Sequence, residues 1–400
     1  MISAHHDDPS ICFVGLANLP ALAREYGRNH IGGAEVQQTL LARALARRGF
    51  DVSMVVANYG QPDGATWDGI RTYRTYRFHE GIPVWRFIHP RWTSVWAALK
   101  RADADVYYVS GAGLLPGLVG AFARRYRRKV IFRVASISDC SPKTLRLRFA
   151  RDRYLYRYGL RRVDLALAQT SEQQQLLKEN YGVNSTVVAS MRDSAGRCRP
   201  FAERDLDVLW VGNIRMLKRP DLLLDLARRM PQRTFEMAGG PMKGSLALFE
   251  QIKTEAATLP NVRFHGTVPY HEMRDLFERA RVLAATSEIE GFPNTYLQAW
   301  SHGVPVVGFL DPENMIADGQ LGCAVKTPDE MAAAVAGLLE SEAEWSAVSE
   351  RCRAFAARSM DESAMVAPYV EALRFVCRSD SQPFPQARGL AREGVARHRP

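Results

Sequence analysis

The chain has 400 residues, of which 46% are hydrophobic, 24% charged and 10% aromatic. This composition is typical of a folded globular protein and excludes a largely disordered one. The length exceeds what one ordinary hydrophobic core supports, so two domains are expected.

The net charge of +10 is unevenly distributed along the chain. Residues 1–200 hold 30 Lys and Arg against 16 Asp and Glu, whereas residues 201–400 hold 23 against 27. The first half alone is therefore expected to meet a negatively charged partner, which could be an anionic membrane surface, a polyanionic acceptor or nucleic acid.

The six cysteines are far apart and form no CxxC pair, which argues against zinc and favours a reducing, cytosolic compartment. The first ten residues lack the basic-then-apolar pattern of a signal peptide. No apolar run reaches the roughly 20 residues of a membrane-spanning helix. We therefore expect a cytoplasmic protein whose membrane contact, if any, is peripheral and on the inner face.

In chain order, the first half opens with a buried strand, a polar loop and a helix that starts after Gly32-Gly33 and stops at Gly49. Strand, loop, helix and strand in this order are typical of a doubly wound parallel sheet. Strands are predicted at 11–15, 52–57, 106–110, 130–135 and 165–168.

The same alternation restarts in the second half, with strands predicted at 208–211, 235–238, 262–265, 282–285 and 306–309. Helices are predicted between them and at 365–376. The boundaries that follow are an amino-terminal domain at 1–195, a linker at 196–204, a second domain at 205–378 whose last helix can pack back on the first, and a loose tail at 379–400.

The most informative segment is 286–309, TSEIEGFPNTYLQAWSHGVPVVGF. Glu290 and a polar turn come just after a buried strand, and a helix is predicted to start near Asn294 and Thr295. A helix amino terminus offers free amides to phosphate or sugar oxygens, and Gln298 is eight residues, or about two helical turns, after Glu290. In the alternative interpretation, which stays open, Asn294 and Thr295 only cap the helix and Glu290 is an acidic residue of the surface.

A second segment, 211–227, places Arg215 and Lys218 on a loop between a strand and a helix that begins at Pro220. Two cations at the carboxyl end of a parallel strand are well placed to neutralise a diphosphate. A solvated basic loop is the alternative interpretation.

These segments resemble the retaining family 4 glycosyltransferases, in which two glutamates are spaced as E-x7-E. The match is Glu290-Gly291-Phe292, with Gln298 in place of the second Glu, followed by GVPVV at 303–307. Gly32-Gly33-Ala34-Glu35, Gly239-Gly240 and the segment 264–269 agree with the family in the same order. The resemblance covers nearly all of residues 11–377.

The resemblance implies an α/β GT-B fold, with two Rossmann-like doubly wound domains facing a central cleft. It also implies a hexosyltransferase-type retaining enzyme that takes a UDP- or GDP-sugar and requires no cofactor or metal. Lys218 and Arg215 would bind the diphosphate, and Glu290 the sugar hydroxyls. The remaining residues implied to contact the sugar donor are Gly33, Gly239, Val268, Gly291, Phe292, Asn294, Thr295 and Gln298.

On the acceptor side, many relatives carry a His, often followed by Asp, after a strand of the first domain. This chain reads VASISDC there, with Ser138 at the place of the His, so Asp139 is the candidate for orienting the acceptor. Asp103-Ala104-Asp105 has the form of a DxD metal motif but precedes a strand, and a turn is the preferred interpretation.

The basic residues of the first domain form two clusters, at 124–129 and 143–162, and the second contains interleaved aromatic residues. Such a stretch can lie on an anionic leaflet and deliver a lipid-linked or glycan acceptor, although an ordinary solvated helix explains it equally well. The resemblance implies a role in bacterial cell-surface polysaccharide synthesis. A non-catalytic nucleotide-sugar-binding relative and a GT-B epimerase or phosphorylase remain alternatives, and no nucleic-acid-binding module is recognised.

Overall fold

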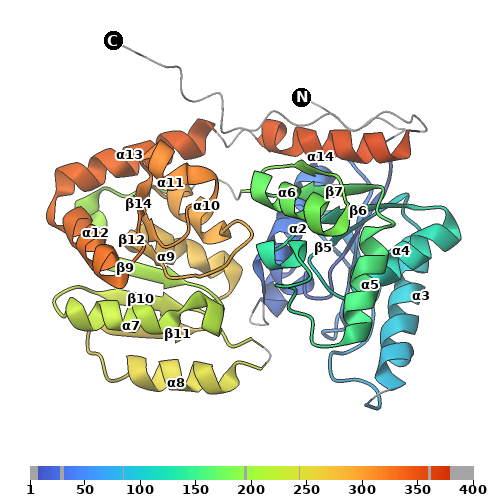
Figure 1. Cartoon of the computed structure of the whole chain (residues 1–400), viewed down its shortest axis with the longest axis horizontal. Helices are drawn as coiled ribbons and strands as arrows, with labels where there is room; N and C mark the ends of the chain where they lie inside the picture. The colour runs from blue at the N-terminus through green and yellow to red at the C-terminus, as the bar shows by residue number, and fades with distance from the viewer. Residues whose placement is uncertain are drawn as a thin grey trace, which may run out of the picture. The chain divides into compact units, whose positions relative to one another are not determined.

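The structure is a computed structural model that describes residues 8–27, 31–83, 85–192, 196–242, 244–358 and 362–378. These residues form two compact units, each built around one sheet (Figure 1). Among the described residues, unit 1 comprises 8–26, 31–191 and 362–378, and unit 2 comprises 27 and 192–358. The tail predicted at 379–400 lies outside the described residues.

Unit 1 contains an eight-stranded sheet in the order β3-β4-β2-β1-β5-β6-β7-β8, in which only the β3–β4 pair is antiparallel. Its strands are β1 (Ile11–Val14), β2 (Val52–Val56), β3 (Thr66–Trp67), β4 (Ile70–Arg74), β5 (Val106–Ser110), β6 (Lys129–Arg133), β7 (Leu165–Ala168) and β8 (Ser185–Val187). Its α-helices are α1 (Leu19–Leu22), α2 (Gly33–Arg47), α3 (Thr93–Ala102), α4 (Leu115–Tyr126), α5 (Ala150–Leu160), α6 (Ser171–Tyr181) and α14 (Glu362–Cys377).

The sheet of unit 1 is buried on both faces, as β1 illustrates. Ile11 and Phe13 belong to one hydrophobic core, whereas Cys12 and Val14 belong to another. Because successive side chains of a strand point to opposite faces, a strand between two cores must be apolar throughout. This is why the strand appears in the sequence as a continuous apolar run rather than as an alternating one.

Unit 2 contains a wholly parallel six-stranded sheet in the order β11-β10-β9-β12-β13-β14. Its strands are β9 (Leu206–Val211), β10 (Phe235–Ala238), β11 (Val262–Gly266), β12 (Ala280–Ala285), β13 (Val306–Gly308) and β14 (Gly322–Ala324). Its α-helices are α7 (Pro220–Arg229), α8 (Leu246–Ala256), α9 (Met273–Arg279), α10 (Asn294–Ser301), α11 (Met315–Gly319), α12 (Pro328–Glu340) and α13 (Glu342–Arg358).

The last helix, α14, is part of unit 1 although it follows unit 2 in the chain. Its Val366 and Leu373 belong to the same core as Ile11 of β1. At its first turn Glu362 forms ion pairs with Arg47 and Arg48, at 2.6 and 2.7 Å. The chain therefore leaves unit 1 after Met191 and returns to it at Glu362.

The segment 196–204, expected to be a linker, packs against unit 2 instead. Arg204 is 1% exposed, and its guanidinium donates hydrogen bonds to the carbonyl oxygens of Phe277 at 3.2 Å and His302 at 2.7 Å. It also stacks on the Trp345 ring, with the guanidinium carbon 4.9 Å from the ring centroid. A segment anchored in this way belongs to the unit, so the boundary lies near Met191.

Candidate functional site

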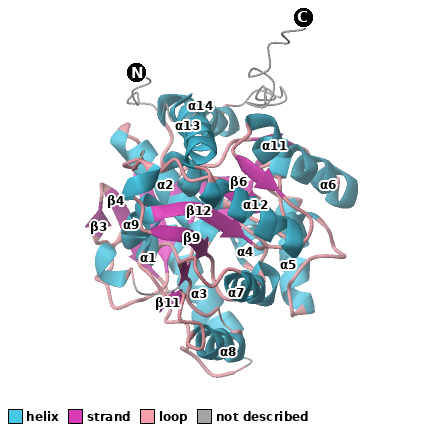
Figure 2. Ribbon diagram, turned by 90° about the vertical axis from the view of Figure 1, so that its left-hand side faces the viewer, coloured by secondary structure: helices cyan, strands magenta, loops and turns pink. Residues whose placement is uncertain are grey.

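The sheet of unit 2 changes winding direction between β9 and β12, which are neighbours (Figure 2). After β9 the chain proceeds to β10 and β11 on one side, then returns to build β12, β13 and β14 on the other. The loops that follow β9 and β12 leave the carboxyl edge of the sheet in opposite directions. Ligands of open parallel sheets bind in the opening that such divergent loops create.

The two loops are joined by hydrogen bonds around Thr286. The Thr286 hydroxyl accepts from the Trp210 indole N–H at 2.8 Å and donates to the Lys218 carbonyl oxygen at 2.6 Å. The Glu288 amide donates to the Leu217 carbonyl oxygen at 2.9 Å. The backbone position of Lys218 is thus fixed by the loop that carries Glu290.

Lys218 and Glu290 form an ion pair between Nζ and Oε1, although they are 72 residues apart in the chain. Each side chain is only 14% exposed. A partly buried cation and carboxylate at a switch point can bind complementary parts of one ligand, because the ammonium attracts phosphate and the carboxylate accepts from hydroxyls. The structure therefore brings together two of the predicted site residues.

Arg215 lies on the same loop, three residues before Lys218, whose amide donates to the Arg215 carbonyl oxygen at 2.9 Å. The Arg215 Nε atom is buried and has no hydrogen-bond partner within the described residues. A buried donor without a partner is costly unless a ligand or water satisfies it. Arg215 is thus available to a second anionic contact on this loop.

The loops after β9, β10 and β11 approach one another through backbone contacts. The Gly212 amide donates to the Ala238 carbonyl oxygen at 3.0 Å, and the Gly239 amide to that of Gly266 at 2.8 Å. Val268, on the loop after β11, is half-buried against the unit 2 core. Gly239 and Val268 therefore lie on loops of the same sheet edge as Lys218.

The loop after β12 leads into α10, whose amino-terminal cap is Pro293. Because the helix begins at Asn294 and its cap residue is Pro293, neither Asn294 nor Thr295 occupies the cap position. Gly291 is half-buried, and Phe292 packs against the unit 2 core. The Gln298 carbonyl oxygen accepts from the Ser301 hydroxyl at 2.8 Å and lies 2.7 Å from His302 Nδ1, which assigns His302 a structural role.

The two remaining predicted residues, Gly33 and Asp139, belong to unit 1. Gly33 is the first residue of α2, after the loop that follows β1. Asp139 follows β6, and its Oδ2 accepts from the amides of Ala135 and Ser136, at 3.2 and 3.1 Å. Burial raises the pKa of Asp139 to about 6, although these amide hydrogen bonds act in the opposite direction.

Asp139 completes a capping box with Ser136 at the start of a short 3-10 helix, Ile137–Cys140. The spacing of Ser and an acidic residue three positions later is a recognisable signal for this arrangement. The sequence interpretation missed it. Thr286 was missed as well. The only signal for it in the sequence was a hydroxyl residue directly after a buried strand.

Asp103 and Asp105 both form ion pairs with Arg128, at 2.5 and 3.1 Å, which gives the two carboxylates a structural role. Within the described residues, no group of three or more His, Cys, Asp or Glu could hold a metal ion. In the same part of the chain, no helix has both the length and the apolar character needed to cross a membrane.

Two family descriptions match the chain. "Glycosyl transferase 4-like domain" matches residues 32–192, and "Glycosyl transferases group 1" matches residues 205–341. A D-inositol 3-phosphate glycosyltransferase from Frankia alni is 35% identical over 147 residues, which are 33% of this chain and 36% of that protein. The O-antigen biosynthesis glycosyltransferase WbnH from Escherichia coli is 27% identical over 135 residues, 32% of this chain and 36% of that protein. The aligned stretch thus spans about a third of each relative.

Among solved structures, sucrose-phosphate synthase from Thermosynechococcus elongatus is similar with a TM-score of 0.73 and 14% identity, over 92% of this chain and 99% of that one. HepE from Anabaena, in complex with UDP and glucose, is similar with a TM-score of 0.69 and 15% identity, over 92% and 100%. Together with the two doubly wound sheets, these similarities confirm the expected GT-B fold of two Rossmann-like units. The central cleft stays a prediction.

Proposed function

Since the chain belongs to the family 4 glycosyltransferases, we propose that it transfers a sugar from a nucleoside diphosphate sugar to a glycan or lipid-linked acceptor. The observation that carries the proposal is the Lys218–Glu290 pair at the switch point of the unit 2 sheet. It combines a cation for the diphosphate with a carboxylate for the sugar hydroxyls.

In the proposed complex, Lys218 and Arg215 bind the diphosphate. The ammonium group of Lys218 leaves Glu290 in part to meet the phosphate, and the partnerless Nε of Arg215 gains an acceptor. Both cations stabilise the negative charge that grows on the diphosphate as it departs, and in many enzymes such electrostatic stabilisation contributes most to the rate enhancement.

Glu290, Gly291 and Phe292 bind the sugar, while Asn294, Thr295 and Gln298 face the nucleoside. The amino-terminal end of α10, whose cap residue is Pro293, is proposed to face the ligand with its positive dipole end. The Gln298 amide can accept from or donate to a ribose hydroxyl. Val268 lies beside the base. The donor is a UDP- or GDP-sugar, and no metal or cofactor takes part.

The transfer is proposed to retain configuration at the anomeric carbon. The bond from this carbon to the diphosphate oxygen breaks, and a bond to an acceptor oxygen forms on the same face. The proton of the acceptor hydroxyl passes to the departing diphosphate, so the diphosphate serves as the base. Asp139 acts on the acceptor indirectly, because its carboxylate holds the loop after β6 through backbone amides.

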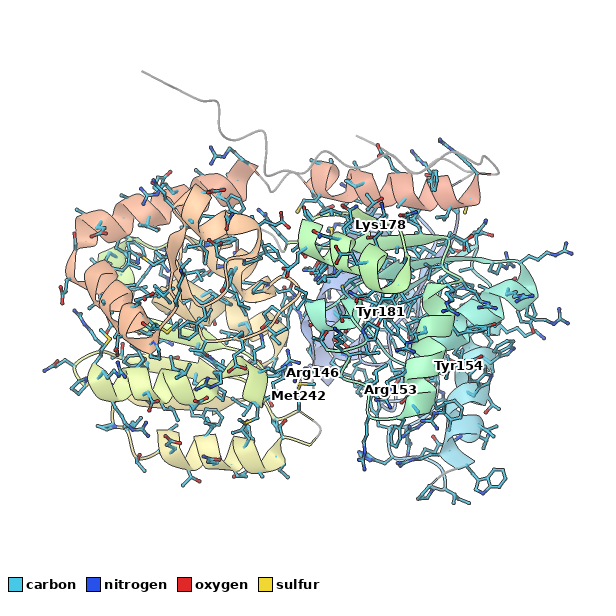
Figure 3. The ribbon with its side chains drawn as sticks, in the orientation of Figure 1. Arg146, Arg153, Tyr154, Lys178, Tyr181 and Met242 are labelled. Atoms are coloured by element: carbon cyan, nitrogen blue, oxygen red, sulfur yellow. The ribbon has the colours of Figure 1, made fainter. Side chains whose placement is uncertain are left out.

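Unit 1 is proposed to bring the acceptor from an anionic membrane surface, in bacterial cell-surface polysaccharide synthesis. On α5, Tyr154 is 68% exposed beside Arg153 (Figure 3), and Phe149, the cap residue directly before α5, is 52% exposed. The Arg151 guanidinium carbon lies 3.7 Å from the ring centroid of Phe87, which links α5 to a segment where Trp85 is 68% exposed. Exposed aromatic residues among arginines are suited to the headgroup region of an anionic bilayer.

Thermal-shift screening of UDP, GDP, ADP and their sugars, followed by product analysis, tests the enzymatic proposal. We expect one nucleotide to raise the melting temperature, and its sugar to appear on the acceptor with the anomeric configuration of the donor. Nucleotide binding without turnover on the native acceptor would favour a non-catalytic relative. A changed sugar in the absence of acceptor would favour an epimerase.

Vesicle co-sedimentation tests the membrane part separately. We expect binding to vesicles that contain anionic lipid and little binding to neutral ones, with Trp85→Ala weaker than the unchanged protein. Leu246→Ala is the matched control, because Leu246 is 62% exposed on unit 2. Binding that does not depend on anionic lipid would overturn this part and leave the enzymatic proposal intact.

A further inference from the structure

Helices α4 and α5 of unit 1 run side by side and touch through glycines (Figure 1). A β-carbon on Gly117 would lie 2.4 Å from the Leu155 carbonyl oxygen, and one on Gly159 would lie 2.4 Å from the Pro116 carbonyl carbon. Farther toward the carboxyl ends, a β-carbon on Gly120 of α4 would be 3.6 Å from that of Arg162, two residues after α5 ends. The contacts advance in the same direction on both helices, so the two carboxyl ends lie together.

A pocket of about 430 Å³ opens where these two carboxyl ends meet. The small residues Gly120 and Ala123 leave the space, because neither has a side chain long enough to fill it. Four arginines line the pocket: Arg124 and Arg128 at the end of α4, and Arg161 and Arg162 at the end of α5. Asp164 is the single acidic residue among the lining residues.

The acidic groups near the pocket are already engaged. Asp164 pairs with Lys129 at 3.1 Å and accepts from the Val130 amide at 2.8 Å. Arg128 is neutralised by Asp103 and Asp105. Three of the pocket's cations are thus left for a ligand, and the charge of the pocket is strongly positive.

The three remaining arginines differ in how they are held. Arg124 and Arg161 form no ion pair with any residue that the structure describes. The Arg162 guanidinium carbon lies 3.7 Å from the Tyr158 ring centroid, and its Nη1 donates to the Tyr158 carbonyl oxygen at 3.4 Å. Stacking orients a planar guanidinium and leaves most of its five N–H groups unused.

Helix dipoles alone do not account for this charge. Each helix carboxyl end carries about half a negative charge, so the two ends together offset roughly one of three cations. An excess of about two positive charges remains around a concave site. This excess is equal in magnitude and opposite in sign to the charge of one dianionic phosphate group.

We propose that this pocket binds a phosphate group, as inorganic phosphate, a phosphate ester or a diphosphate. Guanidinium groups match phosphate oxygens with paired, charge-assisted hydrogen bonds, and here they converge from two helices. The site lies at the amino ends of the unit 1 strands, since Lys129 begins β6 and Asp164 directly precedes β7. It is therefore on the opposite sheet edge from Gly33 and Asp139, and its lining residues all belong to unit 1.

The phosphate could be that of a soluble molecule or of a lipid headgroup, and two sets of measurements distinguish these sources. Both use the full chain with Lys218→Gln, so that the proposed diphosphate site of unit 2 contributes less to the binding that is measured. The pocket variant is R124Q/R161Q. The matched control is R125Q/R157Q, which removes one arginine from the last turn of each of the same helices without touching the pocket.

For the soluble source, pyrophosphate binding is measured by calorimetry at constant ionic strength. We expect R124Q/R161Q to weaken it at least ~10-fold, since two charge-assisted contacts are lost, and R125Q/R157Q to change it less than ~3-fold. For the lipid source, vesicles of phosphatidylcholine with phosphatidic acid are compared with vesicles containing phosphatidylglycerol. We expect R124Q/R161Q to lose the preference for the phosphomonoester.

Either result supports the phosphate site and identifies its source. Equal losses in the pocket and control variants would overturn the proposal, because diffuse positive charge would then explain the binding. The proposal would also be overturned if neither double variant changed pyrophosphate binding or the preference for phosphatidic acid. Circular dichroism spectra of all variants would show that the helices remain folded.

Discussion

A β-carbon on Gly239 would lie 1.8 Å from the carbonyl oxygen of Gly212. The loops after β9 and β10 therefore touch backbone to backbone, with no space for a side chain between them. The loop after β9 carries Lys218, and β10 is the neighbouring strand. The spacing of the two loops therefore sets the shape of the proposed diphosphate site.

Gly239→Ala should push the two loops apart. We expect a loss of roughly 1–3 kcal/mol in the free energy of unfolding, as for other overpacked sites, together with weaker nucleotide binding. Gly337→Ala is the matched control on α12, because a β-carbon there meets nothing within 4 Å and alanine favours a helix. Urea unfolding of both variants would check this, and equal stabilities would contradict the close contact.

Lys218→Gln and Glu290→Gln should separate binding from transfer. Loss of the Lys218 charge should weaken nucleoside diphosphate binding by about 10- to 100-fold. Loss of the Glu290 charge removes the ion-pair partner of Lys218, so this binding should persist or tighten while transfer falls by about 100-fold or more. Calorimetry with the free nucleotide and a product assay give the two readouts. The control is Lys253→Gln, which replaces an exposed lysine on α8 and should change neither readout. Loss of nucleotide binding in Glu290→Gln would contradict the role assigned to Glu290.

Asp139 should make unit 1 less stable as pH rises from about 4 to 6. Its pKa in the folded state is raised to about 6, so between the unfolded value and 6 the folded state holds more protons than the unfolded one. Stability from this group is therefore present at low pH and is lost as pH rises through 6, by roughly 2–3 kcal/mol. Asp139→Asn keeps an oxygen acceptor and cannot ionise.

The measurement for Asp139 is the difference in unfolding free energy between the unchanged protein and Asp139→Asn at several pH values. The unchanged protein should lose stability relative to the variant as pH rises across this window. If it instead gained stability, the amide hydrogen bonds to the carboxylate would outweigh its burial.

Arg204→Lys should destabilise unit 2 by about 2–4 kcal/mol, because one ammonium group cannot reach the several carbonyl oxygens that the guanidinium joins. Burial lowers the pKa of Arg204 to about 10, so the side chain remains charged at neutral pH and its hydrogen bonds are retained. Thermal unfolding by circular dichroism would measure the loss. Arg229→Lys, at an exposed ion pair with Asp329, should stay within about 0.5 kcal/mol of the unchanged protein.

The longer strands of both sheets were predictable because strands buried on both faces appear as continuous apolar runs. β4 was not, since its Arg71 and Arg74 are exposed and break the run. β8 (Ser-Thr-Val) and β14 (Gly-Cys-Ala) were not predicted either, because neither contains the apolar run that marks the equally short β13.

Site residues were predictable where they belong to one segment, as Glu290, Gly291 and Phe292 do. The ion pair between Lys218 and Glu290 was not, since only the β9–β12 pairing brings them together. The unit boundary was placed too late for a related reason. Residues 196–204 lack periodicity, yet Arg204 is held by carbonyl oxygens from two distant segments.

The return of α14 to unit 1 has a consequence for how the protein folds during synthesis. When the ribosome has produced residue 191, the core of unit 1 still lacks Val366, Tyr369 and Leu373. All of unit 2 is translated before these residues appear. Unit 2 can therefore be the first to reach its final structure, while the earlier-made unit 1 waits with apolar surface uncovered and available to chaperones.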